Sequence, residues 1–157
     1  MKLQKTNAAR LLDGKHINYE LIPYKFDESD LSATHVASEL NEPIENVFKT
    51  LVLHGDKSGY FVCVIPGADE INLKQAAQIS GNKKCDLIPM KELLTITGYI
   101  RGGCSPIGMK KSFPTYIHST CTQLSFIYIS AGQRGLQIKI APNDLVQMCN
   151  AKIADLF

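Results

Sequence analysis

The sequence predicts a single-domain α+β protein built around a mixed, curled β-sheet. With 157 residues, 45% of them hydrophobic, the chain is long enough to bury a core of its own. Turn signals are spread evenly along it, and no repeat or linker divides it. Runs of β-forming residues come in pairs across loops, with helical patterns between them, which is typical of hairpins combined with helices. We therefore expect one domain over residues 1–157.

The N-terminal third predicts two helices and an edge strand. Thr6 is a suitable helix cap, apolar residues recur after it, and Gly14 is a typical C-terminal glycine. Alternating apolar residues over 17–24, with a proline near the end, indicate an edge strand. Ser32 is expected to cap the second helix, and Pro43 to open a further helical turn.

The rest of the chain predicts two hairpins and three helices, because β-rich runs alternate with stretches of helical periodicity. In chain order, these elements are a hairpin of residues 47–53 and 60–65, helices over 71–80 and 89–97, a hairpin of residues 125–129 and 135–140, and a final helix capped by Asn143 or Asp144.

Composition and charge exclude several classes of function. The 17 basic and 15 acidic side chains give a net charge of +2, so bulk attraction cannot be the main force that holds a polyanion. Any contact with nucleic acid must be local, and Lys110, Lys111 and Arg134 are the candidates. Five cysteines without CxxC spacing argue against zinc, and we expect neither a metal nor a cofactor. With no bilayer-spanning apolar segment and no signal-like N-terminus, we expect a cytoplasmic protein.

Lys49 is the most unusual residue of the first hairpin. Alternation along its strand places Lys49 on the same face as Leu51 and Leu53. A lysine on an apolar face either extends its ammonium group past the edge of the strand or lines a cavity. In a cavity, the ammonium group can bind an anion or a carbonyl oxygen. The pattern alone leaves both interpretations open.

The glycine-rich segment 102–108 is a second candidate site. Three glycines surround a cysteine, a serine and a proline, so backbone N–H groups can approach a ligand without obstruction by Cβ atoms. The spacing does not fit a GxxxxGK[ST] phosphate loop, and such a segment is better suited to shaping a pocket or supplying oxyanion donors. Cys104 is the thiol best placed for reactivity, but space filling is its simpler role.

Three further residues carry weak signals on pattern alone. Tyr24 has the setting of a half-buried aromatic residue, Ser130 that of a turn former, and Asp144 that of a helix cap.

Three segments, taken in order, resemble the YbaK/EbsC family: residues 47–52, 102–111 and 129–136. The likeness spans nearly the whole chain, and residues 151–155 resemble the C-terminal helix of the family. The family comprises trans-editing aminoacyl-tRNA deacylases related to the editing domain of bacterial prolyl-tRNA synthetase. The chain most resembles the branch that hydrolyses Cys-tRNA(Pro).

The resemblance implies a mixed, barrel-like sheet and a set of site residues. Lys49 matches the family's signature lysine, expected near the terminal adenosine or the ester, and Tyr24 and Asp144 match positions expected to serve catalysis. Two departures concern the pocket: Ala131 replaces a common glycine, which adds a methyl group to that loop, and Cys104 replaces an aliphatic residue. The residues implied to bind substrate are Gly102, Gly103, Cys104, Ser105, Pro106, Ser130 and Gly132.

The resemblance, together with the lack of a convincing protein nucleophile, indicates substrate-assisted chemistry. The thiol of a cysteinyl ester can attack its own carbonyl carbon to give a thiolactone, so the protein need only orient the group and stabilise the oxyanion. The implied partners are the acceptor end of mischarged tRNA and prolyl-tRNA synthetase. Two alternatives stay open: a deacylase for alanine or another small residue on proline tRNA that uses water, and a non-catalytic module that binds the acceptor end or a synthetase.

Overall fold

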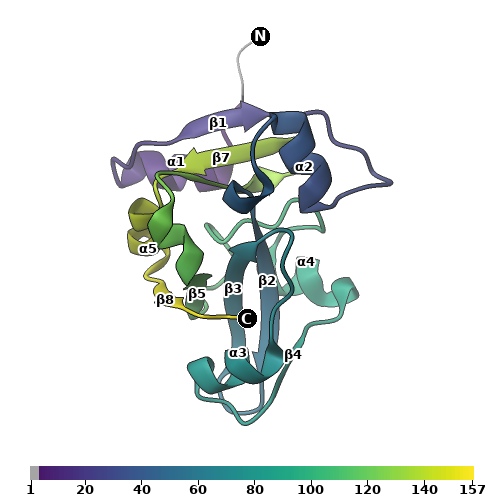
Figure 1. The fold of residues 1–157 in the computed structure, drawn as a ribbon, viewed down its shortest axis with the longest axis vertical. Coiled ribbons are helices and arrows are strands. Elements are labelled where there is room, and N and C mark those ends of the chain that lie inside the picture. Colours follow the sequence, from purple (N-terminus) through teal and green to yellow (C-terminus); the bar gives the residue numbers. More distant parts are fainter. Residues whose placement is uncertain (1–3) are drawn as a thin grey trace.

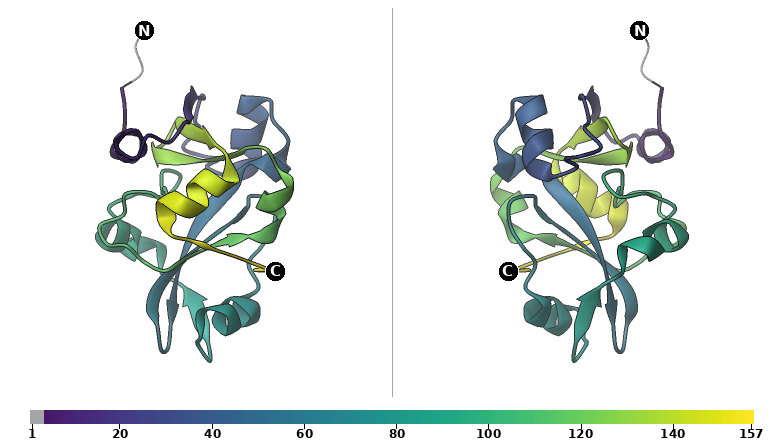
Figure 2. Two further views of the ribbon diagram at one scale, coloured as in Figure 1. Left: turned by 90° about the vertical axis from the view of Figure 1, so that its left-hand side faces the viewer. Right: turned by 90° about the vertical axis from the view of Figure 1, so that its right-hand side faces the viewer.

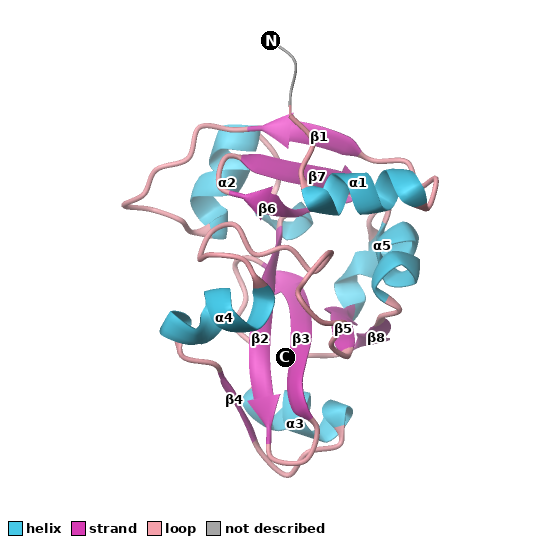
Figure 3. Cartoon of the chain, turned by 180° about the vertical axis from the view of Figure 1, so that it is seen from behind, coloured by secondary structure: helices cyan, strands magenta, loops and turns pink. Residues whose placement is uncertain are grey.

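The computed structural model describes residues 4–157, which form two β-sheets and five α-helices (Figure 1). The smaller sheet has the strand order β1-β7-β6, and the larger has the order β4-β2-β3-β5-β8. Figure 3 shows the strands of the smaller sheet running across the direction of β2 and β3. The strands are β1 Glu20–Pro23, β2 Phe48–Gly55, β3 Gly59–Pro66, β4 Cys85–Leu87, β5 Thr115–His118, β6 Ile127–Gln133, β7 Leu136–Ile140 and β8 Lys152–Ala154.

The two sheets confirm the predicted α+β fold class, but the predicted barrel-like sheet is wrong. The larger sheet is mixed, because β5 runs parallel to both β3 and β8 while β2 is antiparallel to β3 and β4. Within residues 4–157 the strands form two sheets that do not close into a barrel. A parallel bridge between Val47 and Tyr128 joins the sheets, and the side-chain amide of Asn46 donates to the Phe126 carbonyl oxygen beside it (2.9 Å).

The helices begin mostly where the sequence predicts them. Thr6 and Ser32 are the caps of α1 and α2, since their hydroxyl oxygens accept hydrogen bonds from the backbone N–H groups of Ala9 and His35 (3.3 and 3.2 Å). Pro43 directly precedes a 3-10 turn, as expected. The helices are α1 Asn7–Gly14, α2 Ala33–Leu40, α3 Leu73–Ser80, α4 Leu93–Thr97 and α5 Pro142–Cys149, with 3-10 turns η1 Ile44–Asn46, η2 Met90–Glu92 and η3 Ser119–Gln123.

The predicted cap of the last helix and the predicted C-terminal helix are both wrong. Ala141 precedes α5 without a side-chain hydrogen bond, and Pro142 occupies the first turn, where a missing N–H group costs nothing. Asn150 then ends α5 in a left-handed conformation (φ 48°). The following residues cannot form a helix of their own, because they pair with β5 as strand β8.

The β2–β3 hairpin is buried on both faces. Phe48 and Val52 face the main core, which lies between this hairpin and the smaller sheet. Leu53 and Phe61 face a second core under α3. In the left view of Figure 2, α5 lies in front of the hairpin, and its Leu145 belongs to the main core. No helix among residues 4–157 is long and apolar enough to cross a membrane.

His118 holds the C-terminal residues. The Leu156 N–H group donates to His118 Nδ1 (3.1 Å), and the ring of Phe157 packs edge-on against the imidazole, with ring centroids 3.8 Å apart. Burial lowers the pKa of His118 below its ordinary value, although Asp155 and Asp69 act in the opposite direction. Nδ1 accepts this hydrogen bond only when it carries no proton, and the lowered pKa favours the neutral imidazole.

We expect the protein to lose stability as the pH falls through about 6.5. Because burial lowers the pKa of His118 in the folded state, the unfolded chain binds more protons below that pH, and the free energy of unfolding rises with pH. His118→Asn keeps an acceptor and cannot titrate, so urea unfolding should show a flatter pH dependence. His16→Asn, at an exposed left-handed position that asparagine tolerates, is the control. An unchanged slope in His118→Asn would assign the dependence to other groups.

Candidate functional site

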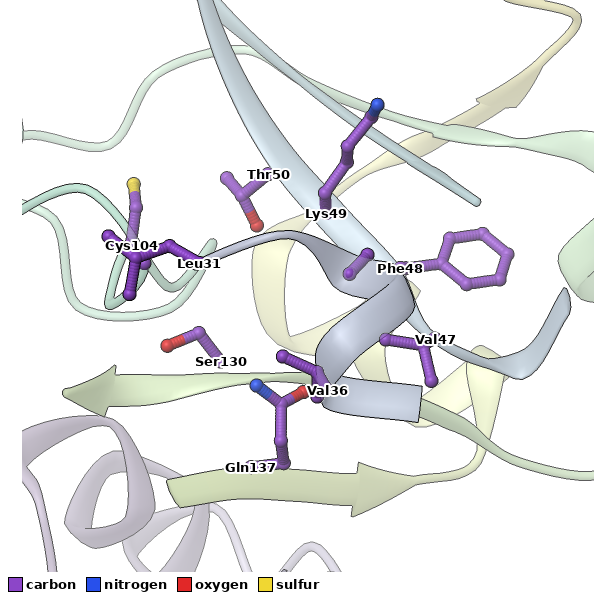
Figure 4. A pocket seen from close by; sticks show the side chains of 11 residues that line it. Leu31, Val36, Val47, Phe48, Lys49, Thr50, Cys104, Ser130 and Gln137 are labelled. Atoms are coloured by element: carbon purple, nitrogen blue, oxygen red, sulfur yellow. The ribbon is translucent and has the colours of Figure 1, made fainter. Parts of the chain in front are cut away.

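A small cavity lies near the junction of the two sheets (Figure 4). Its volume is about 130 Å³. A cavity of about 150 Å³ accepts benzene, so this one has room for about six non-hydrogen atoms. The lining residues come from α2 and the segment before it, from β2 and the residue before it, from the glycine-rich segment, and from β6 and β7: Leu31, Ala33, Val36, Val47, Phe48, Lys49, Thr50, Gly102, Cys104, Ser130 and Gln137.

The start of β2 supplies Lys49 and Thr50. The hydroxyl of Thr50 points into the cavity, toward the side on which Ser130 lies (Figure 4). Lys49 is half-buried and borders both the cavity and a neighbouring groove, while its side chain extends away from Ser130 and Gln137. Within residues 4–157, its ammonium group pairs with no carboxylate. Lys49 thus combines the two interpretations, because it borders the cavity while its ammonium group extends away from the interior.

The glycine-rich segment contributes Gly102 and Cys104 to the lining. Gly102 has a φ of 82°, and a Cβ atom there would lie 3.1 Å from the side chain of Leu31. Gly103 faces away from the cavity toward the β6–β7 turn, where a Cβ atom would come within 3.0 Å of Gln133 Cα. The positive φ favours glycine at position 102, and the close approach of the Gln133 backbone favours it at position 103.

The other predicted residues of this segment lie behind the cavity wall. Ser105 is fully buried, and its hydroxyl oxygen accepts a hydrogen bond from the Ile107 N–H group (3.2 Å). Pro106 borders a different groove.

Among the expected oxyanion donors, the Gly103 N–H group already donates to the Ile100 carbonyl oxygen (2.9 Å). The N–H groups of Gly102, Cys104 and Ser105 have no acceptor within residues 4–157.

The second hairpin brings Ser130 into the cavity. β6 continues through the residues expected to form a loop, and a register shift accommodates Gly132, which has a φ of 105° and packs against Tyr99 outside the lining. The Gly132 N–H group donates to Ser130 Oγ (3.1 Å), so the hydroxyl hydrogen of Ser130 stays available to a ligand. The methyl group of Ala131 is buried in the main core and does not line the cavity.

Tyr24 and Asp144 lie outside the lining. Tyr24 follows β1 and packs in the cluster that contains Val36 and Val47, behind one wall of the cavity. Asp144 borders a separate groove with Lys139. A catalytic role for either residue stays a prediction, since neither borders the cavity.

Thr50 and Gln137 are site residues that the sequence analysis does not identify. Thr50 Oγ1 and Gln137 Oε1 are buried and have no hydrogen-bond partner within residues 4–157. Buried polar atoms without partners are uncommon because each costs about 1–3 kcal/mol. The sequence holds one signal for Gln137, a polar residue between Leu136 and Ile138 in a buried strand.

The cavity has no obvious protein nucleophile. Burial raises the pKa of the Cys104 thiol to about 11, although a hydrogen bond with Thr97 acts in the opposite direction. The thiol is therefore protonated at neutral pH and reacts poorly. The eleven lining residues include neither a histidine nor a carboxylate. The arrangement can bind and orient a small group, but it supplies no general base of its own.

A family model described as "Aminoacyl-tRNA editing domain" matches residues 28–148, a range that contains every residue of the cavity lining. The chain belongs to the aminoacyl-tRNA editing domain family. This confirms the relationship predicted from the three sequence segments.

Individual relatives agree with this assignment of the editing domain. The "Putative Cys-tRNA(Pro)/Cys-tRNA(Cys) deacylase EbsC" of Enterococcus faecalis is 46% identical over 98% of this chain and 93% of its own. A proline–tRNA ligase of Thermosipho africanus is 30% identical over 76 residues, which are 48% of this chain and 13% of the ligase. The solved structure of "a putative trans-editing enzyme for prolyl tRNA synthetase" covers 98% of both chains with a TM-score of 0.81 at 21% identity, which shows a shared fold.

We expect Gly103→Ala to destabilise this editing domain by about 1–3 kcal/mol, as overpacked sites generally do. The added Cβ atom would meet backbone atoms of Gln133, which cannot rotate aside as a side chain can. Urea unfolding measures the effect. Gly14→Ala is the control, because a Cβ atom there meets nothing within 4 Å. Equal stabilities of Gly103→Ala and the native protein would show that the β6–β7 turn can withdraw from this segment.

Proposed function

We propose that this protein hydrolyses mischarged Cys-tRNA(Pro) in trans, with the substrate thiol assisting cleavage of the ester. The observation that carries the proposal is a cavity with room for one small aminoacyl group and with no obvious protein nucleophile. Membership of the editing-domain family supports an aminoacyl ester as substrate, and the name of the 46% identical relative supports cysteine.

The proposed reaction begins within the substrate. The cysteinyl sulfur attacks its own carbonyl carbon, a sulfur–carbon bond forms, and the carbon–oxygen bond to the ribose breaks. The ribose oxygen leaves with a proton, which replaces the one released by the thiol to water. A thiol with a pKa of about 8.5 is a few per cent ionised at neutral pH, so no protein base is needed. Water then opens the thiolactone to give cysteine.

The protein supplies orientation and charge. The cavity holds the cysteinyl group in a compact conformer, which replaces a second reactant by an intramolecular one. The N–H groups of Gly102 and Cys104, the two residues of this segment that line the cavity, are the candidates for stabilising the oxyanion, a contribution typically worth about 10²–10³ in rate for one donor. The ammonium group of Lys49, at the edge of the cavity, is suited to the ribose or the adjacent phosphate.

Arg134 is the best placed of the three expected tRNA contacts. Its guanidinium donates to the Arg101 carbonyl oxygen (2.9 Å), and Arg101 borders the groove that continues from the cavity. Lys110 instead bonds to the Thr95 carbonyl oxygen (3.2 Å), and Lys111 borders a separate groove. Because so few basic groups are available, we expect the affinity for tRNA to be weak. Prolyl-tRNA synthetase is the proposed partner that adds tRNA selectivity.

The first test compares proline tRNA charged with cysteine, serine or alanine. We expect deacylation of the cysteinyl ester to be faster by about 10² or more, because only its thiol provides the efficient intramolecular route. A trapping agent should capture the thiolactone. Comparable rates on all three esters would exclude thiol attack, and cysteine release without trappable thiolactone would favour attack by water.

A second test separates catalysis from binding alone. Lys49→Ala should lower kcat/KM for Cys-tRNA(Pro), since it removes the positive charge at the edge of the cavity. Lys57→Ala, at an exposed turn on the far end of the hairpin, is the control. If the native protein binds charged tRNA or a synthetase but releases no cysteine, the chain is a binding module.

A third test concerns Cys104. Because the high pKa keeps this thiol protonated, Cys104→Ala should retain kcat/KM within about tenfold, whereas loss of a true nucleophile costs about 10⁴ or more. Single-turnover deacylation measures the rate. A loss on the larger scale would identify Cys104 as the attacking group.

A further inference from the structure

Within residues 4–157, two buried side-chain polar atoms lack a hydrogen-bond partner, and both border the cavity. Thr50 Oγ1 comes from the larger sheet and Gln137 Oε1 from the smaller. Gln137 is 5% exposed and lies in the central strand of its sheet, opposite Ser130 in β6 and Ile22 in β1. Its side-chain amide makes no hydrogen bond within the described residues, although a hydroxyl lies directly across the strand pair.

An unengaged amide in this position indicates a ligand. Folding gains nothing from burying Gln137 without a partner, and an apolar residue of the same shape would fill the space at lower cost. Two such atoms on opposite walls of one small cavity are accounted for together if a bound group supplies both missing hydrogen bonds.

The chemistry of the walls indicates which group this is. An amide oxygen accepts hydrogen bonds, and a threonine hydroxyl can accept them as well. The ammonium group of Lys49 extends away from Gln137, so a positive charge there meets no repelling neighbour on that wall. Within a small aminoacyl ester, the carbonyl oxygen only accepts and a thiol donates weakly. The α-amino group is the one strong donor of several hydrogen bonds.

We propose that Thr50 and Gln137 bind the α-amino group of the aminoacyl ester and so determine which esters the site accepts. The inference rests on the proposed function and extends it. Ser130 and the backbone N–H groups of the glycine-rich segment supply donors for the carbonyl oxygen, while Thr50 and Gln137 supply acceptors for the amine.

This division of roles fixes the reactive conformer. The amine, the carbonyl and the side chain all branch from one tetrahedral carbon atom. When the first two are held, the direction of the third is set, and the thiol of an L-cysteinyl ester is aimed without any contact of its own. The substrate class is therefore aminoacyl esters with a free amino group, and N-acylated or peptidyl esters are excluded.

The experiment uses Cys-tRNA(Pro) and its N-acetylated form as a pair of substrates. We expect acetylation to lower kcat/KM of the native protein about ten- to one-hundred-fold, the range for a hydrogen bond to a charged group. Gln137→Met and Thr50→Val, which keep the shape and remove the acceptor, should cause a similar loss on the free amine and little loss on the acetylated substrate. Gln147→Met, exposed on α5, is the control. An equal loss on both substrates would make the two residues structural and overturn the proposal.

Gln137→Glu tests the direction of the hydrogen bond. An ionised carboxylate can only accept, so this variant should discriminate against the acetylated ester more strongly than Gln137→Met does. If Gln137 instead donates to the carbonyl oxygen, Gln137→Glu should lose as much activity as Gln137→Met, and the proposal is wrong.

A binding measurement separates this proposal from the proposed function. If the native protein does not release cysteine, the proposed function fails, but calorimetry with adenosine carrying cysteine through a stable 3′-amide still tests the amine contact. Preference for the free amine over its N-acetyl derivative, removed by Gln137→Met, supports the proposal. Equal binding of the two compounds by the native protein overturns it.

Discussion

The position of the site depends on the bridge between Val47, which directly precedes β2, and Tyr128 in β6. Both side chains are almost fully buried, so the junction is anchored in apolar packing as well as in the backbone. Lys49 and Thr50 follow it by two and three residues in β2, and Ser130 follows it by two in β6. The two sheets run across each other (Figure 3), and residues from both, close to this bridge, line the cavity.

The cavity and its margin differ in electrostatic character. The interior presents neutral hydroxyl, amide, thiol and apolar groups, whereas Lys49 and Arg101 lie along the neighbouring groove. A ligand with a small polar head and a polyanionic body suits this distribution, because positive side chains that approach the interior would repel a cationic head. Attraction to the body and recognition of the head are thus assigned to different residues, which lets one change without the other.

Local features of the fold were predictable from the sequence, and features that depend on distant pairing were not. The caps at Thr6 and Ser32 and the two hairpins involve residues close in sequence. Strands β4 and β5 pair with strands distant in sequence and were not predicted, and residues 152–154 become a strand only because β5 lies beside them.

The site residues also divide into those that local sequence predicts and those that depend on distant pairing. Lys49, Gly102, Cys104 and Ser130 belong to motifs that can be recognised singly, and the structure brings them to one cavity. Thr50 and Gln137 gain their significance from facing the same space across two sheets, which no local pattern reports.

Each of the larger sheet's two edges, β4 and β8, is a strand of three residues. Such brief edges leave few backbone groups for an incoming chain, so the larger sheet offers little template for intermolecular strand addition.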